Sequence, residues 1–204
     1  MAICHPERSE GSAAWLEVTG PAAEQLRLTT PMSVSIWRIC PTEIESVLPS
    51  LADLLRETVN GGAPLGFLPP LTLDDARAYW MSIRPAMYAG TRVLLAAFAD
   101  GEIVGSGQLT FASAPNARHR GEVQKVFVGT AWRGQGVGES LMRALHRRAR
   151  LHGRHLLLLN TRHRGRAEAF YKRLGYREVG VVPGYSVGPA GERFDSVTLY
   201  RELT

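Results

Sequence analysis

Apolar and polar positions in the first part of the chain predict one strand followed by two helices. A period of two over residues 33–40 predicts the strand. Residues 42–60 carry an apolar stripe at helical spacing, begin with the capping-box pattern of Thr42 and Glu45, and end at a glycine pair. A second helix is expected to begin after Thr72, because its hydroxyl can cap the first turn.

The rest of the chain predicts further strands and helices. Residues 91–99 and 102–111 have the composition of two strands, and the Asp100-Gly101 pair between them predicts a tight hairpin turn. The later elements are expected, in order, as strand 121–128, a long helix from Val137, strand 155–160, helix 165–174 and strands 176–182 and 194–202. The predicted order is β-α-α-β-β-β-α-β-α-β-β.

The glycine-rich turn at residues 133–138 gives the first indication of chemistry. It joins strand 121–128 to the long helix, so a strand, a glycine loop and a helix N-terminus follow one another. The first amides of a helix lack partners, the helix dipole favours negative charge, and glycines let a phosphate approach the backbone. The spacing Gly-x-Gly-x-Gly fits neither the dinucleotide fingerprint nor the nucleoside-triphosphate loop. We therefore expect a cradle for another phosphate-bearing ligand.

Three segments together resemble the GNAT superfamily of acyl-CoA N-acyltransferases. They are the Arg-x-x-Gly-x-Gly turn at 133–138, the strand 156–159 that closes on Asn160, and residues 169–176, in which Phe-Tyr precedes Leu-Gly-Tyr. The likeness covers about residues 32–203. It implies an α/β (α+β) GNAT fold with a mixed, mostly antiparallel central sheet of six to seven strands, flanked by about four helices.

The resemblance also implies acetyl-CoA as co-substrate and no metal. The residues that would hold the coenzyme come from the central strand, the glycine loop and the strand after the long helix. They are Val126, Phe127, Val128, Arg133, Gly134, Gln135, Gly136, Val137, Gly138 and Asn160. His152 and His155 are three apart, but no nearby cysteine or acid completes a metal-ligand set.

Acetyl transfer to an amine needs a base for the ammonium, donors for the oxyanion and an acid for the leaving thiolate. Glu122, near the start of the central strand, is the candidate base, and the resemblance implies the same role; the alternative is a surface carboxylate. On a period of two, Glu122 is expected to share a face with Val126 and Val128, with Lys125 on the opposite face. The resemblance implies the amides of Phe127 and Val128 as oxyanion donors.

Tyr171 is the candidate acid for the thiolate. Phe170 and Tyr171 cannot both face one core from a helix, so one is expected in the cleft; the alternative is a core tyrosine. Four residues are expected to line the acceptor pocket, each with a purely structural alternative: Asn60, Phe67, Trp80 and Tyr185. Three histidines are expected at the surface: His119, His146 and His163.

A narrower likeness is to the tabtoxin-resistance acetyltransferases, which detoxify an amino-acid-like β-lactam toxin. Short motifs carry it, at residues 57–63, 66–67, 122–125, 167–171 and 183–185. That group has an Asp where this chain has Asn160, and an amide takes no proton at neutral pH. The expected function is acetyl transfer to a primary amine of a small molecule, such as an amino-acid-like toxin or antibiotic, by direct attack in a ternary complex. Protein or peptide N-acetylation and non-catalytic acyl-CoA sensing remain alternatives.

Charge and composition narrow the partners and the compartment. The first 100 residues carry 7 basic and 11 acidic side chains and the rest carry 17 and 8, so the basic half contains the glycine loop. Aromatic residues do not interleave the arginine clusters, which favours a phosphate-bearing coenzyme over nucleic acid. No apolar run of 18 residues and no signal pattern is found, so we expect a cytoplasmic protein with no membrane partner, a monomer or homodimer.

The N-terminal region gives two further expectations. Residues 1–31 lack a steady period and are expected to be an extension, partly disordered or a loose helix, before an acetyltransferase domain at 32–204. Cys4 and Cys40 lie far apart in the sequence and next to no metal-like pattern. They are expected to be free thiols in a reducing compartment.

Overall fold

The computed structural model describes residues 34–203, so the predicted extension over 1–31 lies outside the described residues. The strands are β1 (Ser35–Ile39), β2 (Arg92–Ala99), β3 (Glu102–Phe111), β4 (Arg120–Val128), β5 (Leu156–Arg162), β6 (Arg177–Val187) and β7 (Arg193–Glu202). The helices are α2 (Ile44–Asn60), α3 (Leu73–Ser82), α4 (Arg84–Tyr88), α5 (Val137–Leu151) and α6 (Arg166–Arg173). The predicted order of elements is confirmed, with the five-residue α4 as an addition that the apolar pattern did not separate from α3.

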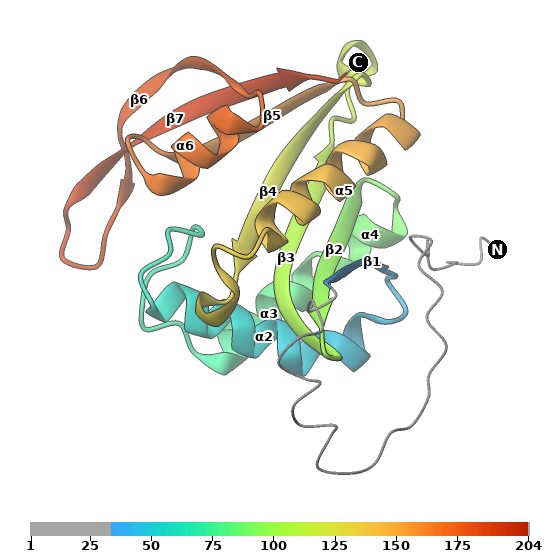
Figure 1. The fold of residues 1–204 in the computed structure, drawn as a ribbon, viewed down its shortest axis with the longest axis vertical. Coiled ribbons are helices and arrows are strands. Elements are labelled where there is room, and N and C mark those ends of the chain that lie inside the picture. The colour runs from blue at the N-terminus through green and yellow to red at the C-terminus, as the bar shows by residue number, and fades with distance from the viewer. Residues whose placement is uncertain (1–33, 204) are drawn as a thin grey trace, which may run out of the picture.

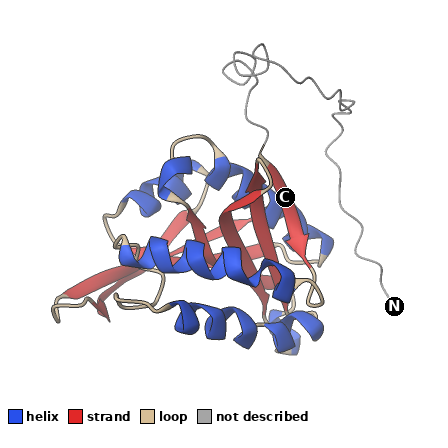
Figure 2. Ribbon diagram, turned by 90° about the horizontal axis from the view of Figure 1, so that it is seen from below, coloured by secondary structure: helices blue, strands red, loops and turns tan. Residues whose placement is uncertain are grey.

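The seven strands form one mixed sheet in the order β1-β2-β3-β4-β5-β7-β6. Every neighbouring pair is antiparallel except β4 and β5, which are parallel. Helices cover both faces of the sheet, as Figure 2 shows. One core lies between the sheet and α5 and α6, and a second lies between the sheet and α2 to α4.

The parallel pair β4 and β5 separates soon after it begins. Only Arg120–Glu122 of β4 pair with Leu156–Leu158 of β5, and the paired register ends there. Beyond this point the two strands diverge like the arms of a V, which is visible in Figure 1. The later residues of β4 therefore have no strand partner on the β5 side, and an opening is left in the sheet.

Local sequence signals were accurate at the hairpin and at one of two helix starts. Asp100 and Gly101 have φ angles of 50° and 84°, as a two-residue hairpin turn requires. The Thr72 hydroxyl accepts a 3.1 Å hydrogen bond from the Asp75 amide and caps α3. The prediction for Thr42 is wrong, because α2 begins one residue later and its N-cap is Glu43.

Two observations bear on the compartment. Cys40 is buried and disulfide-bonded, so the expectation of free thiols is wrong, and the cysteine argument for a reducing compartment falls with it. Sequence separation could not reveal this bond, because a disulfide depends on which Cα atoms the fold brings within about 7 Å. Among residues 34–203, none of the helices has the length and apolar character needed to cross a bilayer.

His146 is buried, so its predicted surface position is wrong. It lies in α5 with 5% exposure, and its Nε2 lies 3.0 Å from the Tyr176 hydroxyl. Burial lowers the pKa of His146 to about 4, and the charges of Arg201 and Arg150 act in the same direction. The imidazole is therefore neutral in the folded protein at neutral pH.

This pKa predicts a loss of stability in mild acid. The unfolded chain binds a proton at His146 near the ordinary pKa of 6.5, whereas the folded chain resists protonation until about 4. Stability is therefore greatest above pH 6.5 and falls as pH drops toward 4, by about 2 kcal/mol from this residue. Urea unfolding between pH 7 and 4.5 measures the free energy of unfolding. This free energy should fall less steeply with pH in the His146→Gln protein. Equal slopes in the two proteins would contradict the assignment.

Candidate active site

The glycine loop joins β4 to the N-terminus of α5, in the order that the sequence predicted. Gly134 and Gly136 have φ angles of 79° and 81°, and Gly136 is the N-cap of α5. The first bond of the helix runs from the Ser140 amide to the Gly136 carbonyl at 3.0 Å. The amides of Val137 to Glu139 therefore precede the helical hydrogen-bond ladder, where an anion can accept from them. A Cβ added at Gly134 or Gly136 would meet no heavy atom within 4 Å, so the space before the loop is open.

Side chains of the loop hold it against β4. Arg133 Nε donates to the Val128 carbonyl at 3.0 Å, and the Gln135 amide donates to the Ala131 carbonyl at 2.9 Å. Val137 is buried in the core beneath the loop. The side chains of these three predicted coenzyme residues are thus occupied in shaping the loop.

The two predicted oxyanion donors differ in direction. The Phe127 carbonyl lies close to Gly105 of β3, so the Phe127 amide also faces β3 and is used in that pairing. The backbone groups of the next residue, Val128, point away from β3, because successive residues of a strand alternate in direction. The Val128 carbonyl accordingly accepts a hydrogen bond from the Arg133 side chain. The Val128 amide therefore faces the opening between β4 and β5, whereas Phe127 does not fit the predicted role.

The side chain of Glu122 lies on the face of the sheet that α3 covers. Glu122 is paired with Thr110, and Gln124 with Gln108, across β3 and β4. Directly paired residues project to the same face. The Gln108 side chain donates to the Tyr79 hydroxyl of α3 at 2.9 Å, which fixes that face as the α3 side. Glu122 is half-buried there.

A β-bulge at Lys125 reverses the alternation along β4. The register shifts between Ser106 and Gln108 of β3, and Lys125 has a φ of 49°. Its ammonium group donates to the Leu65 carbonyl and lies 4.6 Å from the ring centroid of Phe67, on the α3 side.

The bulge overturns the prediction about shared faces. Val126 and Val128 pack against the core under α5 and not beside Glu122. Lys125, predicted on the opposite face, shares the α3 side with Glu122. An extra residue in one strand shifts all later side chains to the other face, and a strict period of two does not anticipate it.

Tyr171 is largely buried in the core. It exposes 8% of its surface, and its ring packs against the rings of Phe170 and Tyr176 at centroid distances of 5.2 and 5.8 Å. Burial raises the pKa of Tyr171 to about 12, so the phenol keeps its proton at neutral pH. Phe170, only half-buried, reaches the glycine loop, where a Cβ at Gly138 would lie 3.5 Å from its ring.

Asn160 lies on β5 beyond the point where that strand leaves β4. It is exposed, and its side-chain oxygen accepts a 2.7 Å hydrogen bond from the Thr198 hydroxyl. This bond ties the side chain to β7, which is the neighbour of β5 on the side away from β4. Asn160 also shares its face with Leu158, the partner of Glu122, because residues two apart on a strand project to one side.

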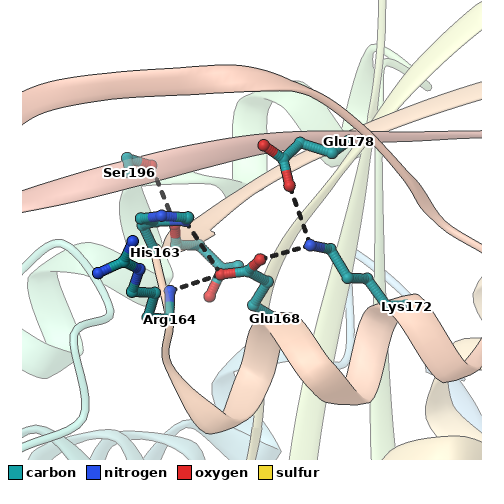
Figure 3. Close-up of polar contacts among 7 residues, drawn as sticks. His163, Arg164, Glu168, Lys172, Glu178 and Ser196 are labelled. Carbon is teal, nitrogen blue, oxygen red and sulfur yellow. Dashed lines mark hydrogen bonds and ion pairs between the residues drawn. The ribbon is translucent and has the colours of Figure 1, made fainter.

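A polar network, which Figure 3 shows, fixes the turn between β5 and α6. Glu168 accepts from the Arg164 amide at 2.5 Å and from Lys172 Nζ at 2.6 Å, and His163 Nδ1 lies 3.2 Å away. The Lys172 hydrogen bond lowers the pKa of Glu168 most, with help from the Arg164 amide. The same lysine bonds Glu178 of β6 at 2.9 Å. A cavity of about 350 Å³ beside this turn is lined by Arg162, His163, Arg164, Val181, Arg193, Phe194 and Asp195, and does not include Glu122.

The four residues predicted to line the acceptor pocket lie in different environments. The Asn60 amide is engaged at both ends with the Leu71 backbone, at 2.8 and 3.2 Å, and serves the loop after α2. Trp80 is fully buried in the α2–α3 core, so it cannot line a pocket. Tyr185 is 59% exposed on the edge strand β6. Phe67 alone lies near the β4 polar residues, beside Lys125.

Sequence reasoning missed three polar residues on the Glu122 face. Arg92 Nη1 donates to Gln108 Oε1 at 2.9 Å, and Gln108, with no exposed surface, bonds the Tyr79 hydroxyl. The signal was Gln108, a long polar side chain between Gly107 and Leu109 in the strand 102–111. Within residues 34–203, no group of three or more His, Cys, Asp or Glu side chains could hold a metal.

Comparisons with known proteins bear on the fold and the enzyme class. Residues 90–178 match the profile of an acetyltransferase (GNAT) domain. A ribosomal-protein-alanine N-acetyltransferase from Brucella melitensis is 21% identical, over 83% of this chain and 99% of its own, with a TM-score of 0.67. The yncA protein of Salmonella typhimurium, solved with acetyl-CoA, is 18% identical over 84% and 95%, with a TM-score of 0.66. A candidate phosphinothricin N-acetyltransferase is 23% identical over 84% and 99%, with a TM-score of 0.66.

These findings bear on the fold and on the class of enzyme. The structural likenesses confirm the GNAT fold that the sequence predicted. The domain match, together with acetyltransferase structures among the neighbours, supports an acyltransferase.

Proposed function

We propose that the protein is an N-acetyltransferase that moves an acetyl group from acetyl-CoA to a primary amine of a small molecule, by direct attack in a ternary complex. The observation that carries the proposal is the opening between β4 and β5 next to the unpaired amides at the start of α5. Open space before Gly136 and a free Val128 amide fit a diphosphate followed by an acyl thioester. The yncA neighbour with acetyl-CoA bound supports the choice of coenzyme.

In this proposal each residue of the site has one role. The coenzyme supplies an activated acetyl group, held by the loop 134–138 and by Asn160. The Glu122 carboxylate takes the proton of the acceptor ammonium, directly or through a water, on the α3 face. The Val128 N–H donates to the acetyl oxygen from the opening. Tyr171, protonated at neutral pH, supplies a proton to the sulfur.

The acceptor is best sought among amino-acid-like molecules, including toxins and antibiotics. The short motifs that resemble the tabtoxin-resistance acetyltransferases support this, as does the likeness to a candidate phosphinothricin N-acetyltransferase. Asn160 cannot serve as a second base, so Glu122 acts alone. We further propose that residues 32–204 form the catalytic domain and that the protein acts in the cytoplasm.

Thiol release tests the proposal. The full chain is mixed with acetyl-CoA and a panel of amines, amino acids and peptides with free N-termini, and free coenzyme thiol is followed with time. Release that depends on a small amine supports the proposal. Release only with peptides would favour protein N-acetylation, and binding of acetyl-CoA without release would favour a sensor.

Replacing Gly136 with valine should weaken acetyl-CoA binding at least tenfold. A β-branched residue at a φ of 81° costs about 1–2 kcal/mol, and its side chain would project into the space before the loop. Calorimetric titration of acetyl-CoA measures the affinity, and thermal unfolding measures the strain. Gly153→Val is the matched control, because Gly153 also has a positive φ and open surroundings but follows α5 instead of starting it. Equal affinities of the two variants would contradict the phosphate cradle.

Tyr171→Phe should lower kcat about 10- to 100-fold and leave the affinity for acetyl-CoA within about threefold. The change removes one hydroxyl and keeps the ring that packs against Tyr176. Steady-state kinetics and calorimetry measure the two quantities. A kcat equal to that of the unaltered protein would make Tyr171 a core residue alone.

A further inference from the structure

Two cationic side chains, Arg92 and Lys125, lie on the same face of the sheet as Glu122. Arg92 Nη1 is bonded to Gln108, which in turn bonds Tyr79. The Lys125 ammonium lies 5.4 Å from the ring centroid of Tyr79. Arg92 is therefore hydrogen-bonded to Gln108, Gln108 is hydrogen-bonded to Tyr79, and Lys125 lies over the ring of the same tyrosine.

Neither cation has an acidic partner among residues 34–203. The Lys125 ammonium bonds a backbone carbonyl and contacts aromatic rings, and Arg92 bonds an amide oxygen. Arg92 Nε is buried without a hydrogen-bond partner. Burial lowers the pKa of Lys125, and the positive charge of Arg92 lowers it further. Two half-buried like charges disfavour each other, and a bound anion would relieve this cost.

The strand register sets the cations at a defined position relative to Glu122. Arg92 pairs with Thr110, and Thr110 pairs with Glu122, so the three residues form one row across β2, β3 and β4. Their backbones are separated by two strand spacings, about 10 Å in all. This separation is comparable to the length of a molecule a few bonds long plus the side chains that hold its two ends. A positive end and a negative end of one small ligand would match this row.

We infer that Arg92 and Lys125 bind a carboxylate of the acceptor and so direct its amine to Glu122. The substrate class is then the amino acids and their close analogues. Guanidinium and ammonium groups both form charge-assisted hydrogen bonds with carboxylates. Arg92 and Lys125 are specificity-determining residues in this scheme. The inference rests on the proposed function for its reaction and on the strand register for its geometry.

Matched pairs of acceptors test the inference. The full chain is assayed with leucine, phenylalanine, methionine and glutamate, each against its α-carboxamide, by thiol release from acetyl-CoA. We expect kcat/KM to be about 10- to 100-fold higher for the acid of at least one pair, because charged hydrogen bonds are lost in the amide. Calorimetry of the same pairs with the protein and coenzyme A should give the same preference. Equal values for acid and amide in every pair would overturn the inference.

Charge-removing variants complete the test. Arg92→Gln and Lys125→Gln should each reduce the acid-over-amide ratio about tenfold, and Arg92→Lys should restore part of it. An acid and its amide differ in amine basicity, but this difference is the same for every protein. It therefore cancels when the ratio of a variant is compared with the ratio of the unaltered protein. Arg77→Gln, an exposed arginine of α3 that pairs only with Asp74 at 3.4 Å, is the control and should leave the ratio unchanged. Thermal unfolding checks that each variant is folded.

The outcomes separate the inference from the proposed function. Preferential binding of acids without thiol release would uphold the carboxylate site and refute the acetyl transfer. Acetylation of amines with no regard to a carboxylate would uphold the transfer and refute the site. An unchanged ratio in both glutamine variants would also refute the site.

Discussion

Glu122→Gln should lower kcat/KM by about 10²- to 10⁴-fold at neutral pH, the usual contribution of a positioned base. The substitution keeps the size of the side chain and its place beside Thr110, but an amide cannot accept the ammonium proton. Deprotonating an alkyl ammonium with a pKa near 10.4 costs roughly 4–5 kcal/mol at pH 7. Water alone is too weak a base to take over this role from the missing carboxylate. Thiol-release kinetics with the best acceptor measure the effect.

The same variant should bind acetyl-CoA as tightly as the unaltered protein. Glu122 lies on the α3 face, away from the glycine loop at the start of α5. Its pH–rate profile should also change shape, because the titrating base has been removed. Glu202→Gln, an exposed glutamate near the end of β7, is the control and should keep full activity. If Glu122→Gln keeps its kcat/KM and its pH profile, the base is another group.

Most of the fold follows from local signals that the tertiary structure reinforces. The apolar stripe of α5 and the apolar run of β5 specify their elements because one face, or both, must be buried. The hairpin at Asp100 and Gly101 follows from turn geometry alone. The Thr42 prediction failed because Glu43, and not Thr42, is the N-cap residue of α2. The Glu43 carboxylate accepts a 2.9 Å hydrogen bond from the Cys40 amide.

The glycine loop was predictable from the sequence, and the surroundings of Glu122 were not. Residues 133–138 are contiguous, and their glycines have the local backbone conformation that an anion cradle requires. The face that carries Glu122 instead combines β2, β3, β4 and α3, and its residues meet only through strand register. The bulge at Lys125, which no residue type signals, decides which side chains join Glu122.

Trp80→Ala should lower the free energy of unfolding by about 3–5 kcal/mol. Trp80 has no exposed surface, packs against Tyr79 and Phe127 at centroid distances of 5.2 and 6.4 Å, and donates from Nε1 to the Leu51 carbonyl at 2.9 Å. Truncation leaves a cavity between α2, α3 and the sheet and also removes the donor to a buried carbonyl. Urea unfolding at neutral pH measures the change.

The size and type of this effect separate a core tryptophan from one that lines the acceptor pocket. Replacing a core residue lowers the free energy of unfolding but leaves KM for the acceptor nearly unchanged in the protein that remains folded. The milder variant Trp80→Phe should destabilise the protein less, so its KM can be measured. A pocket residue would raise KM at little cost in stability. Trp37, 46% exposed on the edge strand β1, gives the matched control: Trp37→Ala should cost less than about 1 kcal/mol. Equal destabilisation by the two alanine variants would contradict the position of Trp80 in the core.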